Sequence, residues 1–176
     1  MKIGKVDKHL QSISLVHKGL EKQAFGQKKG IQQASQTFKN TDKTTLAGVD
    51  LKVKLAGKTK QTDLIVSLFK EESGQPAGEA LASTKVNVSD IDAMYSNIHA
   101  NLSYKGLEKS AKYAIVLSQE SPSDEAYFEW LTGEEVSPNS NFSHLLTTKD
   151  ENGNNVDKWV NDYKTGDAWM KVYTTK

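Results

Sequence analysis

The feature of this sequence that most restricts its fold is a strict alternation of apolar and charged residues. In Val49-Asp50-Leu51-Lys52-Val53-Lys54-Leu55, every second side chain is apolar and those between are charged. Successive side chains of a β-strand point to opposite faces of the sheet, so this stretch predicts a strand with one buried and one hydrated face. A helix would instead place its apolar residues three and four positions apart.

The same period recurs along most of the chain and predicts its fold class. Residues 113–118 are apolar on both faces, which indicates a central strand. Strands of this kind, separated by turn residues and without long amphipathic helices, predict an all-β fold, an antiparallel β-sandwich of the jelly-roll type. The predicted strands are residues 13–16, 34–38, 49–55, 62–69, 81–88, 96–102, 113–118, 126–131 and 168–174.

The segments between these strands are predicted as turns and loops. Residues 71–78 form a loop by composition, and residues 150–167 form a long polar loop with few apolar anchors. Residues 89–92 are expected to begin a short helical turn, with Ser89 as its N-cap.

The length of the chain restricts its domain organisation. A chain of 176 residues is long enough to bury the core of one domain. We expect a polar linker over residues 1–10 and a single sandwich module over residues 11–176. No apolar stretch is long enough to span a membrane and the first residues lack an apolar signal core, so membrane insertion is not expected. A secreted protein of this sequence would be a mature fragment or an excised module.

Composition argues against several function classes. The net charge is +1, and all 23 basic residues are lysines. Proteins that read nucleic acids rely on arginine for bidentate contacts to guanine and phosphate, so a nucleic acid is not an expected partner. The absence of cysteine removes thiolate metal sites, cysteine nucleophiles and disulfides.

Motifs of catalysis are missing from the sequence. It contains no nucleophile elbow, P-loop, dinucleotide fingerprint or His-Glu-x-x-His sequence. Glu129 is the best candidate for a catalytic acid, because it stands among the aromatics Tyr127, Phe128 and Trp130. Alternation directs it away from the face of Phe128 and Trp130, which favours a hydrated carboxylate, and a glycosidase would need a second carboxylate in the same cleft. The chain is therefore predicted not to be an enzyme.

Residues 150–157 have oxygen donors at a spacing similar to that of a calcium loop. They depart from the EF-hand pattern, because the sixth position is Asn155 instead of glycine and the twelfth is Asn161 instead of glutamate. Asn152-Gly153 is also a strong hairpin-turn signal. We favour the turn and expect no cofactor, with a structural calcium ion as the alternative.

Aromatic residues in the last third of the chain are the best candidates for a binding site. Trp169, Lys171 and Tyr173 share one face of their predicted strand, and a face that holds lysine is normally hydrated. Exposed rings can pack on the C–H groups of a sugar while amides and carboxylates bind its hydroxyls. Core filling is the alternative for each tryptophan. The candidate ligand-binding residues are Trp159, Trp169, Trp130, Tyr163, Tyr127, Asn152, Asn154 and His144, with Trp159 first because it lies in the long polar segment.

Several stretches of the sequence resemble a known family. They are residues 35–38 with 46–51, residues 63–69 with Gly74-Gln75-Pro76-Ala77-Gly78, residues 112–118, and the ending Gly166-Asp167-Ala168-Trp169-Met170-Lys171-Val172-Tyr173. Over residues 30–174 the chain is similar to the jelly-roll carbohydrate-binding modules appended to Gram-positive, streptococcal-type surface glycoside hydrolases. The resemblance concerns framework strands, so it implies the sandwich and a non-catalytic carbohydrate-binding role but transfers no binding residue.

Two function hypotheses follow. The first is a carbohydrate-binding module that targets a parent glycosidase or a cell surface to glycans, with a galactose-terminated glycan as the expected ligand and an extracellular or cell-wall location. The second is a structural or protein-binding sandwich, a spacer in a surface protein or phage fibre. The spacer predicts buried tryptophans and no response to sugars.

Overall fold

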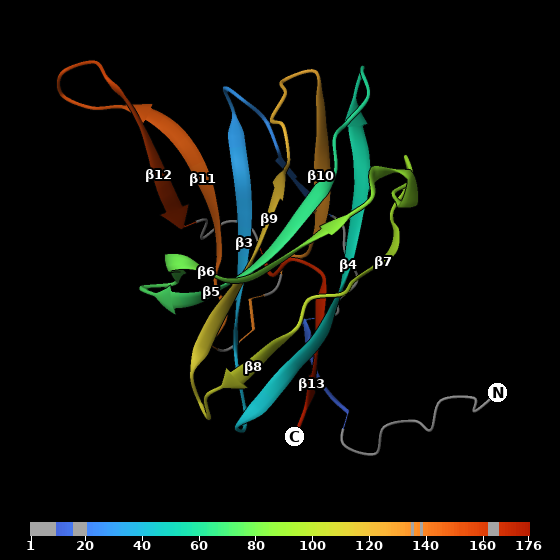
Figure 1. The fold of residues 1–176 in the computed structure, drawn as a ribbon. Helices are drawn as coiled ribbons and strands as arrows, with labels where there is room; N and C mark the ends of the chain where they lie inside the picture. Colours follow the sequence, from blue (N-terminus) through green and yellow to red (C-terminus); the bar gives the residue numbers. More distant parts are fainter. Residues whose placement is uncertain (1–9, 16–20, 135, 138, 162–165) are drawn as a thin grey trace.

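The computed structural model describes residues 10–15, 21–134, 136–137, 139–161 and 166–176. Within these residues the chain is almost entirely β, and two antiparallel sheets pack face to face (Figure 1). The chain passes repeatedly from one sheet to the other, which is typical of jelly-roll sandwiches. The predicted all-β antiparallel sandwich is therefore confirmed.

The first sheet, sheet A, has seven strands in the described residues and is built around the long strand β4 (Thr44–Gly57). Its strand order is β1-β13-β4-β10-β2, and two short strands, β7 and β8, pair with the other edge of β4. The remaining bounds are β1 (Gln11–Leu15), β2 (Glu21–Phe25), β7 (Ser96–Ala100), β8 (Tyr104–Leu107), β10 (Ala126–Thr132) and β13 (Met170–Thr175).

The second sheet, sheet B, has six strands in the described residues, in the order β12-β11-β3-β9-β5-β6. Their bounds are β3 (Ile31–Lys39), β5 (Leu64–Glu72), β6 (Gln75–Val86), β9 (Lys112–Gln119), β11 (Phe142–Lys149) and β12 (Asn155–Asn161). The β11–β12 hairpin projects beyond the rest of the sandwich at the upper left of Figure 1.

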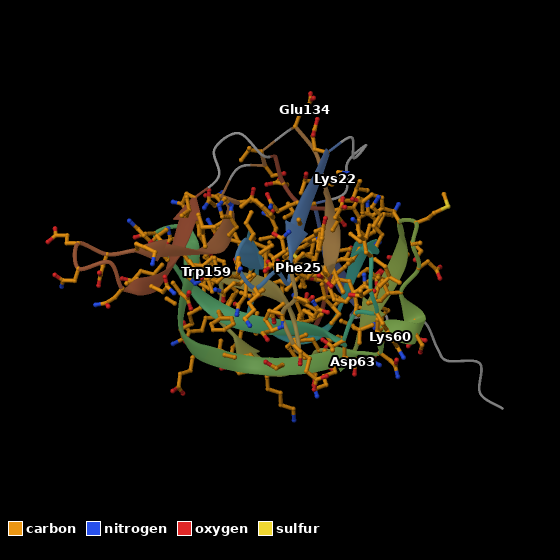
Figure 2. All side chains as sticks on the ribbon, turned by 90° about the horizontal axis from the view of Figure 1, so that it is seen from above. Lys22, Phe25, Lys60, Asp63, Glu134 and Trp159 are labelled. Atoms are coloured by element: carbon orange, nitrogen blue, oxygen red, sulfur yellow. The ribbon has the colours of Figure 1, made fainter. Side chains whose placement is uncertain are left out.

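The core lies between the sheets and follows the alternation seen in the sequence. Val49, Leu51 and Val53 of β4 are fully buried, whereas Lys52 and Lys54, which alternate with them, face outward. Several aromatic rings are fully buried in the core, among them Phe25, which lies near the centre of Figure 2. Phe25 and Phe128 stack at 5.6 Å, and Trp130 meets Phe142 edge-on at 6.0 Å. Full burial of side chains of this size contributes about 1.5–3 kcal/mol each to the free energy of folding.

The central position predicted for residues 113–118 is also confirmed. These residues belong to β9, which pairs with β3 on one side and β5 on the other. Tyr113 to Leu117 are buried on both faces of the strand. In β7, Ile98 and Ala100 are buried, and His99 between them is exposed, as expected for a strand with one buried face.

The structure shows that two loop predictions, for residues 71–78 and 150–167, are wrong. Within residues 71–78 the chain makes a two-residue hairpin turn, Ser73-Gly74, with φ of 54° and 79°. This left-handed geometry matches the twist of the flanking strands and suits glycine at the second position. The polar segment 150–167 contains strand β12, which pairs with β11 through seven residue pairs in the described part of the chain.

Other differences concern weak sequence signals. The short helical turn is the 3₁₀ segment Val88–Asp90, and its N-cap is Asn87 instead of Ser89. Strands β2, β8, β11 and β12 were not expected, because edge and near-edge strands expose much of both faces and lose the alternation. Of the predicted linker, only Leu10 lies within the described residues, and it is exposed. None of the described residues forms a helix long and apolar enough to cross a membrane.

Candidate functional site

The side of sheet A that is turned away from sheet B carries a mixture of aromatic and charged side chains, and we name it the open face. Cross-strand pairing sets its composition, because directly paired residues point to the same side of a sheet. Lys54 pairs with Glu129, and Asp50 pairs with both His99 and Lys171. The open face consists of Asp50, Lys52, Lys54, Tyr95, His99, Tyr127, Glu129, Trp169, Lys171 and Tyr173.

Lysines lie over three of the rings on the open face. The Nζ of Lys52 is 4.8 Å from the centroid of Trp169, and that of Lys54 is 5.1 Å from the centroid of Tyr95. The Nζ of Lys171 is 5.4 Å from the centroid of Tyr173. Such cation–π contacts contribute about 0.5–1 kcal/mol at exposed sites. They place a positive charge over each of these rings, and a ligand that stacks on a ring has to displace a flexible lysine.

A hydrogen-bonded group of three residues stands near one end of the open face. One carboxylate oxygen of Asp50 lies 2.6 Å from His99 Nδ1, and the other accepts from the Tyr173 hydroxyl at 2.7 Å. The hydrogen bond to Asp50 raises the pKa of Tyr173, because the protonated hydroxyl is the donor. Half of the His99 side chain is exposed. The group therefore offers an imidazole edge and a fixed phenol ring to solvent.

Glu129 lies at the other end of the open face, where alternation placed it, but it is buried instead of hydrated. Its residue exposure is 9%, and its Oε2 pairs with Lys22 Nζ at 3.3 Å. Tyr95 lies close by, and its hydroxyl has no hydrogen-bond partner among the described residues. Burial, with a smaller contribution from the negative charge of Glu129, raises the pKa of Tyr95 to about 12.

The middle of the corresponding outer side of sheet B is enclosed, and we name this side the closed face. One row of side chains crosses it from strand to strand through directly paired residues: Asn161, Ser143, Ser35, Val116, Ser67 and Ser83. Ser35 and Ser143 are 0% exposed although they point away from the core between the sheets. Their hydroxyls have no hydrogen-bond partner among the described residues.

The closed face is enclosed because the tip of the β5–β6 hairpin reaches β12, the far edge of the same sheet (Figure 1). The amide of Gln75 donates to Asn161 Oδ1 at 3.2 Å and to the Trp159 carbonyl at 3.4 Å. The amide of Asn141 donates to the Gly74 carbonyl at 2.8 Å and to Asn161 Oδ1 at 3.0 Å. Sheet B thus curls until its two edge hairpins meet.

A cavity of about 270 Å³ lies at this meeting point. It is bordered by the β5–β6 turn, by the loop before β11 and by the end of β12. Its lining residues are Thr37, Glu71, Ser73, Gly74, Lys112, Asn139, Ser140, Asn141 and Asn161. Apart from Gly74, every residue of this lining has a side chain with a polar group.

The structure separates the candidate residues that the sequence grouped together. Trp130 belongs to the core: its ring is 0% exposed, and its Nε1 donates to the Trp169 carbonyl at 2.9 Å. This position corrects the prediction for Trp130, because no ring surface is left for a ligand. Trp169 is only 8% exposed and lies under Lys52, so it is less hydrated than expected. Tyr127 is half-buried on the open face.

The other candidates belong to sheet B. Trp159 is half-buried on edge strand β12, instead of standing in a loop, and lies on the same side as Asn161. His144 is opposite Ala34 on the side of β11 that faces the core. Asn152 and Asn154 are exposed in the β11–β12 turn. Tyr163 lies outside the described residues.

The segment predicted as either a hairpin turn or a calcium loop forms the β11–β12 turn. Asp150 Oδ1 accepts the backbone N–H groups of Asn152 and Asn154, each at 2.9 Å, which is an Asx-type turn. The prediction of a hairpin turn at Asn152-Gly153 is therefore confirmed. Within the described parts of the chain, no three His, Asp or Glu side chains are grouped so that they could hold a metal ion.

Sequence reasoning missed several members of both faces. His99 had a signal, because it alternates with the buried Ile98 and Ala100. Tyr95 had none, since it lies in an irregular segment before β7. Asn139 and Asn141 meet Asn161 only through the curl of sheet B, which no local pattern encodes.

No protein-family model matches this sequence, and no curated protein matches it either. The functional argument therefore depends on the geometry of the two faces.

Proposed function

We propose that the protein is a non-catalytic carbohydrate-binding module and that the open face is its binding surface. The observation that carries this proposal is the collection of Tyr127, Trp169, Tyr173 and Tyr95 on one sheet face together with fixed polar groups. Tyrosine and tryptophan rings offer flat apolar surfaces to sugar C–H groups, and carboxylates, imidazole and ammonium groups bind hydroxyls.

The arrangement of the polar groups supports a ligand that both donates and accepts hydrogen bonds. Asp50 is already fixed by His99 and Tyr173, so its neighbours are held in place before a ligand arrives. The lysines of the face provide donors on flexible stems. Sugar hydroxyls match this mixture, and a galactose-terminated glycan is the ligand class that we propose.

A single shallow face of this kind binds weakly. Targeting would come from linkage in cis to a parent glycosidase or surface protein, since tethering raises the effective concentration of the second binding event. We therefore place the proposed module in a larger extracellular or cell-wall-attached protein.

The test is a glycan array followed by titration of the best glycan into the wild type and into Tyr173→Ala. Removal of one aromatic contact of about 1–1.5 kcal/mol should weaken binding about tenfold. Asn154→Ala, in the exposed β11–β12 turn, is the control and should bind as the wild type does. A flat response across the array would refute carbohydrate binding. A loss in Asn154→Ala with none in Tyr173→Ala would move the site away from the open face.

A second candidate function is a structural or protein-binding spacer. It is supported by the burial of two tryptophans, because Trp130 is 0% and Trp169 is 8% exposed. Acrylamide quenching of Trp159→Phe distinguishes the two functions, since only Trp130 and Trp169 then emit. For a spacer, quenching stays low with and without glycans. For a binding module, a glycan that displaces Lys52 from Trp169 shifts the emission.

A further inference from the structure

The cavity at the closed face is a site of its own, on the opposite sheet from the open face. We propose that it binds one neutral polyhydroxylated residue, such as the terminal monosaccharide of a glycan. The cavity volume of about 270 Å³ lies just below the range of roughly 300–1,000 Å³ for small-molecule sites. It therefore suits a single ring better than a chain.

The lining of the cavity offers polar groups that the protein does not already use. Among the described residues, the ammonium of Lys112 and the side-chain amide of Asn139 make no hydrogen bond or ion pair, and both residues are exposed. Glu71 Oε1 accepts from the backbone of Gly74 at 2.5 Å, which fixes its carboxylate at the rim. Donors and acceptors thus converge on one space from three different strands and loops.

The balance of charge and polarity selects the ligand class. The lining contains one cation, Lys112, and one anion, Glu71, so it favours neither a phosphate nor a metal ion by net charge. It contains no aromatic and no purely aliphatic side chain, so an apolar ligand has no apolar side chain to pack against. Asn139 and Asn141 present amides, which donate and accept at once. Sugar hydroxyls do the same.

The floor of the closed face lies beside the cavity and is tightly packed. Ser35 is two residues from Thr37 and on the same side of β3, and Ser143 pairs directly with Asn161. Thr37 and Asn161 both line the cavity. The hydroxyls of Ser35 and Ser143 are buried without a partner in the described residues. An unsatisfied buried hydroxyl costs about 1–3 kcal/mol, and these two hydroxyls have no accessible surface, so the packing around the cavity bears that cost.

The geometry of the turn keeps the cavity in shape. Ser73 and Asn139 line it from opposite loops, and both have positive φ, at 54° and 62°. Asn141 connects these loops through its bonds to Gly74 and Asn161. The site is thus held by the same contacts that close sheet B, and a ligand enters a preformed space.

This inference takes its ligand class from the proposed function but places it at a different site. The test is NMR titration of the full chain with free galactose, glucose and mannose, and separately with inorganic phosphate. We expect the side-chain amide signals of Asn139, Asn141 and Asn161 to shift with at least one monosaccharide. Asn139→Ala and Lys112→Ala, both at exposed positions, should weaken this binding about tenfold each. Tyr173→Ala on the open face is the matched control and should leave it unchanged.

The outcomes separate the two proposals. Monosaccharide shifts confined to the open face, or abolished by Tyr173→Ala alone, overturn the cavity site and leave the proposed function intact. Shifts at the cavity amides with phosphate but with no sugar overturn the ligand class. No shift with any monosaccharide overturns the cavity site, and a positive glycan array alongside that result keeps the proposed function.

Discussion

The two outer faces of this sandwich are built from the same kind of strand but have opposite characters. The open face of sheet A carries long charged side chains and rings, and Lys171 and Tyr173 there are half-buried. On the closed face of sheet B, the short side chains of Ser35 and Ser143 are as buried as the core. The difference comes from the β5–β6 hairpin, whose tip bonds to β12 through Gln75.

The comparison shows that the exposure of a sheet face depends on which other segments of the chain pack over it. Small side chains at Ser35, Ser67 and Ser143 leave room for the sheet to curl and for the hairpin to approach. On sheet A, the lysines of β4 and the rings beside them keep the face open. One side of the molecule thus becomes a broad platform, and the other becomes a small polar cavity.

The largest expected effect concerns the core that supports both faces. Trp130→Ala should lower the free energy of unfolding by about 3–5 kcal/mol, because it removes a fully buried ring and its hydrogen bond to the Trp169 carbonyl. Urea denaturation measures this. Trp159→Ala, at the half-buried edge of the closed face, should cost clearly less. Equal losses would show that Trp159 is a core residue too and would weaken the distinction between core and closed face.

An intermediate effect tests the closure itself. Ser35→Leu inserts a large side chain into an enclosed face and should cost about 1–3 kcal/mol through overpacking. Ser14→Leu, at an exposed position that pairs with Lys171 on sheet A, is the matched control and should stay within about 0.5 kcal/mol. Both are measured by chemical denaturation. If the two substitutions lower the free energy of unfolding equally, Ser35 is accessible in solution and the closed face is not enclosed.

The smallest effect is a pH dependence on the open face. The pKa of Tyr95 is raised from 10.0 to about 12, so its neutral form is favoured in the folded state. The associated stability is fully present below pH 10, and it is lost as the pH rises through about 12, because the unfolded chain ionises first. Tyr95→Phe should flatten this part of the stability profile while changing little at neutral pH. Ultraviolet titration of tyrosinate gives the pKa directly, and an ordinary value for Tyr95 would show that it is not buried against Glu129.

Much of the framework could be predicted from local patterns. Alternation located β4, β5, β7 and β13, and the apolar run at residues 113–118 gave the central strand β9. Strands β2, β11 and β12 could not be predicted in the same way, because their residues are partly exposed on both sides and carry no clean period. Asn152-Gly153 correctly signalled a turn, yet the strand that follows it was hidden by polarity.

The candidate site was less predictable than the fold. Sequence reasoning brought Trp130, Trp159 and Trp169 together, whereas the structure puts them in the core, at the edge of sheet B and under Lys52. The polar residues of the cavity are more than sixty positions apart where Asn141 meets Gly74. Such a meeting depends on the twist and curl of a whole sheet, so no local window contains it.

The sequence by itself determined the class of fold and the side of each main strand that enters the core, because alternation is a local consequence of backbone geometry. Only the tertiary structure decided which outer face is open and which is enclosed. That decision depends on long-range contacts, above all the hydrogen bonds that join the β5–β6 turn to Asn161 and Asn141. Burial is a property of everything that packs around a side chain, and it follows from the assembled sheets instead of from the strand alone.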